Sequence, residues 1–469
     1  MSGHLSRRKF LGVTAGAGMV LGAHSRVRPG GLGAAADPPA PSIVKIHKVF
    51  LAKPVPTWPK PNLDIPAEMA FLDKHMAAAE KQLGDVKFVG GELLRVAADV
   101  QKLLAAPDDS DGFLVFNLTS TVSHLLAPIV EAGRPVVLFS QPYSGHDWGS
   151  VAPLQKAGKK VIVLATSDYG EIAEAGRILR VGPKLRQSRI LAVTGGSVSE
   201  DTVKKFKEKL GVDVVSVDGT RLGDAYKAVD ARAAEEEADL WIRGAVKVIE
   251  PTREDIVKSS RLFLAMKSLL EKERAQAFTI NCLGLFRQGS LPAYPCLGFC
   301  RLNDIGLVGA CEADLESTVT MLVFGHAYGI PGFISDPVID TATNTVIHAH
   351  CVSPTKMDGP AGPAAPYFVR SHLEDNKGAC LQVKMRLGEP ITTAKLFNLD
   401  TLLISTGKIL DAPDSDRGCR TKITTQVTSA RKMLENYSGG LHRVIFYGDR
   451  LQGMKHLAVF MGWKVVEEI

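Results

Sequence analysis

The sequence predicts an α/β fold class, with two Rossmann-like parallel-sheet domains followed by a mainly β C-terminal domain. From Ile43 to about Arg180, short continuous apolar runs alternate with amphipathic stretches, and the same alternation begins again near Arg189. Such alternation is typical of βαβ units, and continuously apolar strands are expected where both faces of a parallel sheet are covered. After about Pro354 the apolar runs become β-rich and are separated by glycines and prolines, which favours a mainly antiparallel domain.

The individual elements follow from hydrophobic periodicity. In the first domain we predict strands at 44–51, 112–117, 135–140 and 160–166, with helices at 67–83 and 169–179. In the second we predict strands at 190–194, 212–217 and 277–281, with helical spacing at 200–210, 224–250 and 253–273. C-terminal strands are predicted at 379–387, 391–399, 402–407 and 422–428.

These patterns divide the chain into four expected segments. They are an N-terminal signal segment, an N-terminal α/β domain, a second α/β domain and a C-terminal β-rich domain, at 1–36, 37–186, 187–356 and 357–469 respectively. Within the second domain, Gly195-Gly196-Ser197 precedes a predicted helix and could hold a phosphate. The stretch lacks the G-x-G-x-x-G pattern, so a tight strand-to-helix turn is favoured over a nucleotide site.

The charge of the chain argues against a nucleic-acid binder. Lys plus Arg number 56 and Asp plus Glu number 50, which gives a net charge of +6. Five of these charges fall within residues 1–36, which hold no acid, so the remainder carries 6 − 5 = +1. A nucleic-acid binder would show a basic patch in its folded part. No apolar run reaches 18 residues, so no membrane span is expected.

The first 36 residues have the order of an export signal. Ser6-Arg7-Arg8-Lys9-Phe10-Leu11 is followed by an apolar stretch and then by the small residues Ala34–Ala36. Charged, apolar and small-residue regions in that order are typical of signal peptides, and the paired arginines resemble a twin-arginine signal. We therefore expect cleavage near Ala36 and a periplasmic or other extracytoplasmic location; a basic tail is the alternative.

Seven cysteines all lie in the second half of the chain. An odd number leaves at least one thiol unpaired within one chain. Folding before export would keep the thiols reduced, and a disulfide framework is not expected in so large a chain. We interpret these residues as buried structural thiols.

Acids and histidines gather in two stretches of the second half. Glu312 and Asp314 follow an apolar run and open a predicted helix, Asp336 ends the short run 333–335, and His350 and His442 lie near further strands. Ligand sites of open α/β sheets lie at the carboxyl ends of strands. Two carboxylates with one or two imidazoles fit a divalent cation of the Mn²⁺ type. Taken singly, the same residues could be helix-start acids, a turn former and buried histidines.

Four short stretches resemble the L-fucose isomerase and L-arabinose isomerase superfamily. They are Cys311-Glu-Ala-Asp-Leu, Gly332-Phe-Ile-Ser-Asp336, His350-Cys351 and Gly439-Gly-Leu-His442. The separation of Glu312 and Asp336, 336 − 312 = 24 residues, resembles the fucose isomerase pattern. The segment 370–392 resembles the start of the superfamily's C-terminal barrel-like domain.

This resemblance implies a metal-dependent aldose–ketose isomerase acting on a deoxysugar or pentose-like sugar through an enediol. Glu312 and Asp336 would bind Mn²⁺ or another divalent cation and serve as the acid/base pair. His442 would be a metal ligand, and His350 a fourth ligand in the arabinose-type arrangement. Gln288 and Arg370 are candidates for binding the sugar, as is Trp148. The resemblance also implies a homo-oligomer, a trimer or a hexamer.

The sequence is also compatible with two other functions. A lyase or epimerase acting on a carbohydrate derivative would use the same metal-assisted proton abstraction. A non-catalytic sugar-binding or assembly module would be favoured if the side chains of Glu312, Asp336 and His442 failed to converge in three dimensions.

Overall fold

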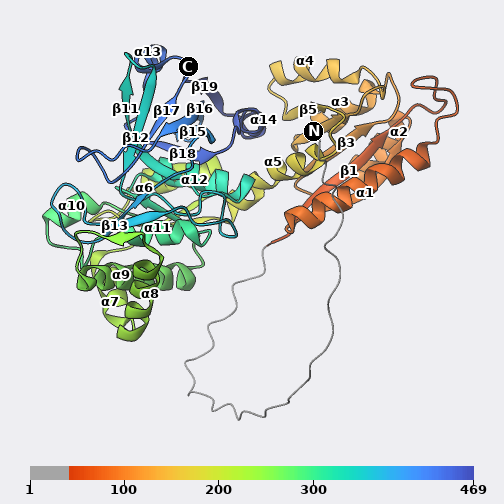
Figure 1. Cartoon of the computed structure of the whole chain (residues 1–469). Coiled ribbons are helices and arrows are strands. Elements are labelled where there is room, and N and C mark those ends of the chain that lie inside the picture. The colour runs from red at the N-terminus through yellow and green to blue at the C-terminus, as the bar shows by residue number, and fades with distance from the viewer. Residues whose placement is uncertain (1–41, 469) are drawn as a thin grey trace, which may run out of the picture. The chain divides into compact units, whose positions relative to one another are not determined.

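A five-stranded parallel sheet organises the N-terminal part of the computed structural model, which describes residues 42–468 (Figure 1). The strand order is β2-β1-β3-β4-β5 and every pairing is parallel. Its strands are β1 (Val44–Leu51), β2 (Val86–Leu94), β3 (Gly112–Asn117), β4 (Val136–Ser140) and β5 (Val161–Ala165). Its helices are α1 (Ile65–Leu83), α2 (Ala97–Ala105), α3 (Ser123–Glu131), α4 (Val151–Lys156) and α5 (Glu171–Arg186), with a 3₁₀ turn η1 (Asp147–Ser150). The predicted parallel-sheet domain is confirmed here.

The sequence pattern does not predict strand β2, and the reason is physical. It is an edge strand in which only Val86 and Leu94 are buried, and Gly90 and Gly91 interrupt it. A strand of this kind has no continuous apolar run, whereas β3 and β4 are buried at every residue. The predicted export signal at 1–36 lies outside the described residues.

A second parallel sheet follows, with the order β10-β9-β6-β7. Its strands are β6 (Arg189–Val193), β7 (Asp213–Ser216), β9 (Ala277–Ile280) and β10 (Val308–Cys311). Its helices are α6 (Glu200–Leu210), α7 (Gly219–Ala228), α8 (Ala231–Gly244), α9 (Arg253–Glu273), α10 (Cys282–Arg287), α11 (Cys296–Asp304) and α12 (Leu315–Tyr328). The helical stretch predicted at 224–250 is two helices, because Asp230 caps the start of α8 with its side chain.

The last strands form a mainly antiparallel sheet of order β15-β18-β11-β12-β17-β16-β19. Strands β15 and β16 also pair, so hydrogen-bonded pairs link six strands in a closed series. The strands are β11 (Phe333–Asp340), β12 (Thr345–His350), β15 (Pro390–Phe397), β16 (Thr401–Asp411), β17 (Thr421–Gln426), β18 (Arg443–Tyr447) and β19 (Lys464–Glu467). Helices α13 (Ala430–Asn436) and α14 (Leu451–Met461) accompany them. A small sheet joins β14 (Cys380–Val383), β13 (Tyr367–Arg370) and β8 (Lys247–Val248).

Strands β11 and β12 belong to this mainly antiparallel sheet, although they precede residue 357. Asp336, expected at the end of a short parallel strand, lies inside β11, which continues to Asp340. Only the first three residues of β11 are buried. The apolar signal therefore stops at the middle of the strand, and the sequence pattern placed its end too early.

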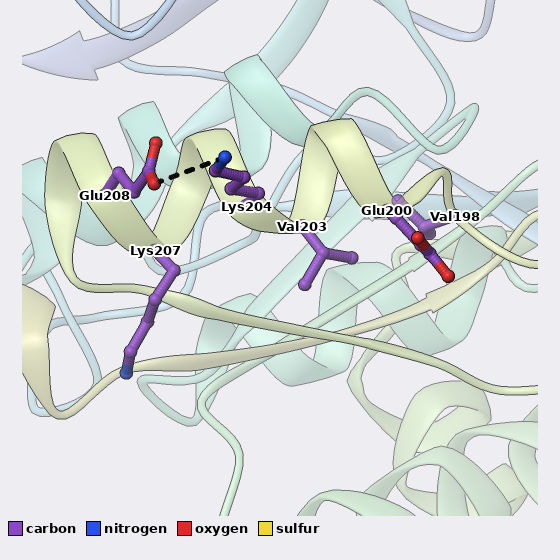
Figure 2. Close-up of a pocket in the computed structure, with 6 residues that line it drawn as sticks. All are labelled: Val198, Glu200, Val203, Lys204, Lys207 and Glu208. Atoms are coloured by element: carbon purple, nitrogen blue, oxygen red, sulfur yellow. Dashed lines mark ion pairs between the residues drawn. The ribbon is translucent and has the colours of Figure 1, made fainter.

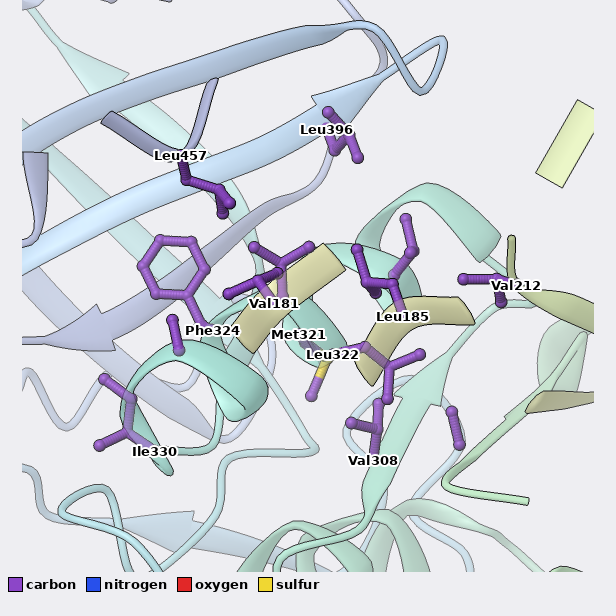
Figure 3. Packing of buried hydrophobic residues seen from close by; sticks show 14 of the residues in the cluster. Val181, Leu185, Val212, Val308, Met321, Leu322, Phe324, Ile330, Leu396 and Leu457 are labelled. Atoms are coloured by element: carbon purple, nitrogen blue, oxygen red, sulfur yellow. The ribbon is translucent and has the colours of Figure 1, made fainter. Parts of the chain in front are cut away.

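Helix α12 packs between the sheets and fixes the second parallel sheet against the C-terminal strands. Met321, Leu322 and Phe324 lie among side chains of α5, β15 and α14 in one hydrophobic cluster (Figure 3). The rings of Phe324 and Phe446 stack with centroids 3.6 Å apart. This packing connects α12 to β18. No helix among residues 42–468 is long and apolar enough to cross a membrane.

Candidate active site

Four side chains predicted as metal ligands converge where the second parallel sheet meets the antiparallel one. Nε2 of His442 lies 3.3 Å from Oδ1 of Asp336 and 3.4 Å from Oε2 of Glu312. Nε2 of His350 lies 3.6 Å from Oε1 of Glu312 and 4.0 Å from Oδ2 of Asp336. We call Glu312, Asp336, His350 and His442 the carboxylate–histidine cluster.

Strand register brings three of these residues together. Strand β11 pairs with β18 through Ser335 and Arg443, so the same register continued by one residue sets Asp336 opposite His442. On its other side, Asp336 pairs with Ala349, the neighbour of His350. Asp336 and His442, which are 442 − 336 = 106 positions apart in the chain, therefore meet because β11 lies between β12 and β18.

Glu312 reaches the cluster from the turn between β10 and α12. It follows the last residue of β10, as the sequence predicted, and its backbone is left-handed, with φ of 61°. Ala313 is also left-handed, with φ of 53°. Two consecutive non-glycine residues in this region store strain, and such strain is often found at functional sites.

Three buried atoms of the cluster have no hydrogen-bond partner among the described residues. They are Oδ1 of Asp336, Nε2 of His350 and Nε2 of His442. The imidazole side chains are only 5% and 8% exposed, whereas both carboxylates are 32% exposed. An unpartnered buried polar atom is costly, and these three face one point. The arrangement fits a divalent cation that would enter past the carboxylates.

Asp314, which the sequence placed at the start of a helix, also contacts the carboxylate–histidine cluster. Its Oδ1 accepts a hydrogen bond from the backbone N–H of Ser317 and so caps α12. Its Oδ2 lies 2.9 Å from Nδ1 of His442 and 3.0 Å from Nζ of Lys395. A carboxylate on the far nitrogen of a ligating histidine fixes its tautomer and ring orientation. Lys395 is buried inside strand β15, and a lysine within an apolar strand is the sequence feature that could have indicated it.

The cluster's ionisation follows from these contacts. The contact with His350, followed by that with His442, holds the pKa of Glu312 below its usual range. Burial alone would lower the pKa of His442, but its contacts with Asp314, Asp336 and Glu312 raise that pKa to about 11. Without a bound cation, the positive charge of the His442 imidazolium therefore offsets the negative charges of the carboxylates around it.

The other predicted site residues lie elsewhere. Gln288 is exposed at the end of α10, and the guanidinium of Arg370 is engaged by Glu250 and Gln382. Trp148 lies in η1, with its ring centroid 6.5 Å from that of His146. The structure shows no contact of these three residues with the carboxylate–histidine cluster.

A surface cavity of about 430 Å³ on α6 is not part of the cluster (Figure 2). Its lining includes the ion pair Lys204–Glu208, one helical turn apart at 3.8 Å. The nearby Gly195-Gly196-Ser197 stretch forms a turn in which Gly195 is left-handed and Thr194 Oγ1 donates to Gly196 O. This is the tight strand-to-helix turn that the sequence favoured.

All seven cysteines are free thiols, and six of them are buried. The interpretation as buried thiols is confirmed for those six; Cys419 is partly exposed. Cys311, next to Glu312, offers a sulfur within 4.8 Å of ligand atoms of Glu312 and His350.

Comparison with known proteins points to sugar isomerases. No protein-family model matches the chain. The chain is 24% identical over 289 residues to a sulfoquinovose isomerase of Priestia aryabhattai, covering 58% of this chain and 62% of that protein. It is 26% identical over 194 residues to an L-arabinose isomerase of Pectobacterium carotovorum subsp. carotovorum, covering 39% of this chain and 38% of that protein. The chain thus aligns with less than two thirds of these curated relatives' length.

Among solved structures, the chain is similar to GanP, a glucose-galactose binding protein from Geobacillus stearothermophilus. That likeness has 15% identity and a TM-score of 0.16, covering 52% of this chain and 82% of that one. It carries no argument about fold or function. The similarity to sugar isomerases confirms the predicted resemblance at a coarse level, and the likeness to fucose isomerases stays a prediction.

Replacing Asp314 with Asn should weaken Mn²⁺ binding by about 10–100-fold, the usual cost of losing a carboxylate behind a ligating histidine. The amide would no longer hold the Nδ1 hydrogen of His442 as strongly. Isothermal titration with Mn²⁺ measures the change. Glu316→Gln is the control, because Glu316 approaches Lys395 at 3.7 Å without contacting His442. Equal dissociation constants for the two variants would contradict the role of Asp314.

Proposed function

We propose that this chain is a metal-dependent aldose–ketose isomerase acting on a deoxysugar or pentose-like sugar. The observation that carries the proposal is the convergence of buried polar atoms without hydrogen-bond partners among the described residues. They belong to Asp336 in β11, His350 at the end of β12 and His442 just before β18, beside Glu312. The similarity to named sugar isomerases supports it.

Glu312, Asp336 and His442 are the residues that would hold the cation, and oxygen with imidazole donors suits Mn²⁺. A divalent cation bound there supplies electrostatic stabilisation of negative charge on the sugar oxygens. His350 lies in the same cluster.

The two carboxylates would carry the proton transfer. In aldose–ketose isomerisation one base removes the proton from C2 of the open-chain sugar and a proton is returned to C1, while the hydroxyl proton of O2 is lost and O1 gains one. The contacts of His350 and His442 lower the pKa of Glu312, so Glu312 is a carboxylate at neutral pH. The partial exposure of Glu312 and Asp336 lets a sugar reach them.

The decisive experiment incubates the purified full chain with Mn²⁺ and a panel of aldoses, including L-fucose, L-arabinose and sulfoquinovose. We expect conversion of at least one aldose to its ketose, detected by NMR, and loss of activity after chelation. A C2-epimeric aldose would indicate an epimerase, and a cleaved product would indicate a lyase. Sugar binding without any conversion would instead support a non-catalytic module.

The pH dependence of cation binding follows from His442. Because its pKa lies near 11, it is protonated at neutral pH, and a cation that binds Nε2 must displace that proton. Mn²⁺ affinity should therefore rise with pH, by about tenfold per unit when one proton is released. Titrations in buffers of different ionisation enthalpy count the protons. A pH-independent affinity would exclude Nε2 of His442 as a ligand.

We further propose that residues 1–36 direct export by the twin-arginine route and that the protein is a homo-trimer or homo-hexamer. N-terminal sequencing of the secreted chain tests the first statement. Analytical ultracentrifugation of the purified protein tests the second, and a monomer at micromolar concentration would contradict it.

A further inference from the structure

The two histidines of the cluster differ at their outer ring nitrogens. Nδ1 of His442 faces an acceptor, the Asp314 carboxylate at 2.9 Å. Nδ1 of His350 faces a donor, because the backbone N–H of Cys351 donates to it at 3.0 Å. An imidazole nitrogen that accepts a hydrogen bond must hold a lone pair, and one that donates must carry a hydrogen.

These opposite neighbours give the two rings opposite tautomers. In its neutral form His442 carries its hydrogen on Nδ1, which leaves the lone pair of Nε2 pointing at the cluster. Neutral His350 carries its hydrogen on Nε2 instead. Both Nε2 atoms face the carboxylates. When both rings are neutral, as cation binding requires of His442, one ring therefore presents an acceptor to the cluster and the other presents a donor.

We infer that His350 is a positioning residue whose Nε2–H donates to Glu312, and that His442 alone supplies an imidazole ligand to the cation. This inference rests on the proposed metal site and departs from the four-ligand set that the arabinose-type resemblance implies.

The distances and the burial agree with a donor role. Nε2 of His442 lies within 3.4 Å of a carboxylate oxygen of both acids, whereas Nε2 of His350 is 3.6 Å from Glu312 and 4.0 Å from Asp336. A shift of a few tenths of an ångström closes the gap to Glu312 to an ordinary hydrogen bond. His350 is 4% exposed, so water cannot easily take that hydrogen bond.

Ligation by His350 would carry a cost that ligation by His442 does not. To bind a cation through Nε2, the ring must move its hydrogen to Nδ1. That nitrogen would then face the N–H of Cys351, donor against donor, inside a buried strand end. The loss of one buried hydrogen bond and the opposed donors favour the alternative in which His350 keeps its hydrogen on Nε2.

Such a donor would orient Glu312. The left-handed turn at residues 312 and 313 fixes the backbone, but the carboxylate itself is partly exposed and touches no lysine or arginine closely enough to form an ion pair among the described residues. A hydrogen bond from His350 to Oε1 would leave Oε2 turned toward His442, the side from which the cation would be held.

The test uses Mn²⁺ alone with the full chain, without sugar. Electron spin-echo envelope modulation should detect one imidazole nitrogen directly bound to Mn²⁺. His442→Gln should abolish this nitrogen signal and weaken binding by more than about 100-fold. His350→Gln keeps an N–H donor and should retain the signal, with affinity within about threefold; His350→Phe, which has no donor, should weaken binding by about tenfold.

The outcomes separate this inference from the proposed function. Two coupled imidazole nitrogens in the unaltered protein would overturn the inference while leaving the metal site in place. A loss of affinity in His350→Gln equal to that in His442→Gln would do the same. If Mn²⁺ fails to bind the unaltered chain, this result contradicts the proposed metal-dependent function, and the inference about His350 is overturned with it. The nitrogen count in the unaltered protein stands even if a variant does not fold.

Discussion

Asp336→Asn should lower kcat/KM for the aldose by about 10²–10⁴-fold, the range for losing a general acid–base group. The side chain keeps its shape, but the amide is no longer an anionic ligand or a proton acceptor. Mn²⁺ affinity should fall in parallel, because Oδ1 of Asp336 is one of the unpartnered atoms facing the cluster. Steady-state kinetics and isothermal titration measure the two losses.

The matched control for this change is Asp340→Asn on the same strand. Asp340 bonds to Ala342 and Thr343 at the turn after β11, away from the cluster. Activity in Asp340→Asn should stay within about twofold of the unaltered protein. If both variants keep full activity and full Mn²⁺ affinity, Asp336 is neither ligand nor acid–base group.

Glu468→Gln should destabilise the C-terminal sheet by about 3–5 kcal/mol, the usual cost of removing one partner from a buried ion pair. Arg443 and Glu468 are both 0% exposed and form two parallel hydrogen bonds, of 2.7 and 2.6 Å. The same guanidinium also donates to the carbonyls of Ser438, Gly440 and His442. The variant leaves an uncompensated buried cation beside the loop that carries a cluster histidine.

Hydrogen exchange of peptides spanning 438–447 and thermal unfolding measure this loss. The neighbouring Glu467→Gln is the control, because Glu467 pairs with Lys455 where both are about one-third exposed. Exposed ion pairs contribute about 0–1 kcal/mol. Equal effects of the two substitutions would show that burial of the Arg443–Glu468 pair does not govern stability here.

The sequence predicted the parts of the fold that have strong local signals. Buried strands such as β3 and β4 show as continuous apolar runs, and α9 begins at a capping box of Thr252 and Asp255. Edge strand β2 lacks such a run. The pairing of β11 and β12 with strands beyond residue 390 depends on contacts between distant segments, which periodicity does not report.

The candidate site likewise contains residues that local sequence features indicate and residues whose roles depend on contacts between distant segments. Glu312 could be predicted because an acid after a buried strand and before a helix lies at a known type of ligand-binding edge. Residue types and resemblance indicated Asp336, His350 and His442. The roles of Asp314 and Lys395 depend on the distances from Asp314 to His442 and to Lys395. The different tautomers of the two histidines depend on single hydrogen bonds. No local pattern carries that information.

The changeover of pairing partners at Asp336 has a consequence for how the chain tolerates insertions. Strand β11 pairs with β18 up to Ser335 and with β12 from Asp336 onward. One extra residue between Asp336 and Val338, or between His442 and Val444, would shift a ladder by one position and turn side chains to the opposite face. A much longer insertion in the segment 356–366, between strands β12 and β13, would leave both ladders in register. The geometry of this site therefore depends on the register of strands β11, β12 and β18 and not on the length of chain between them.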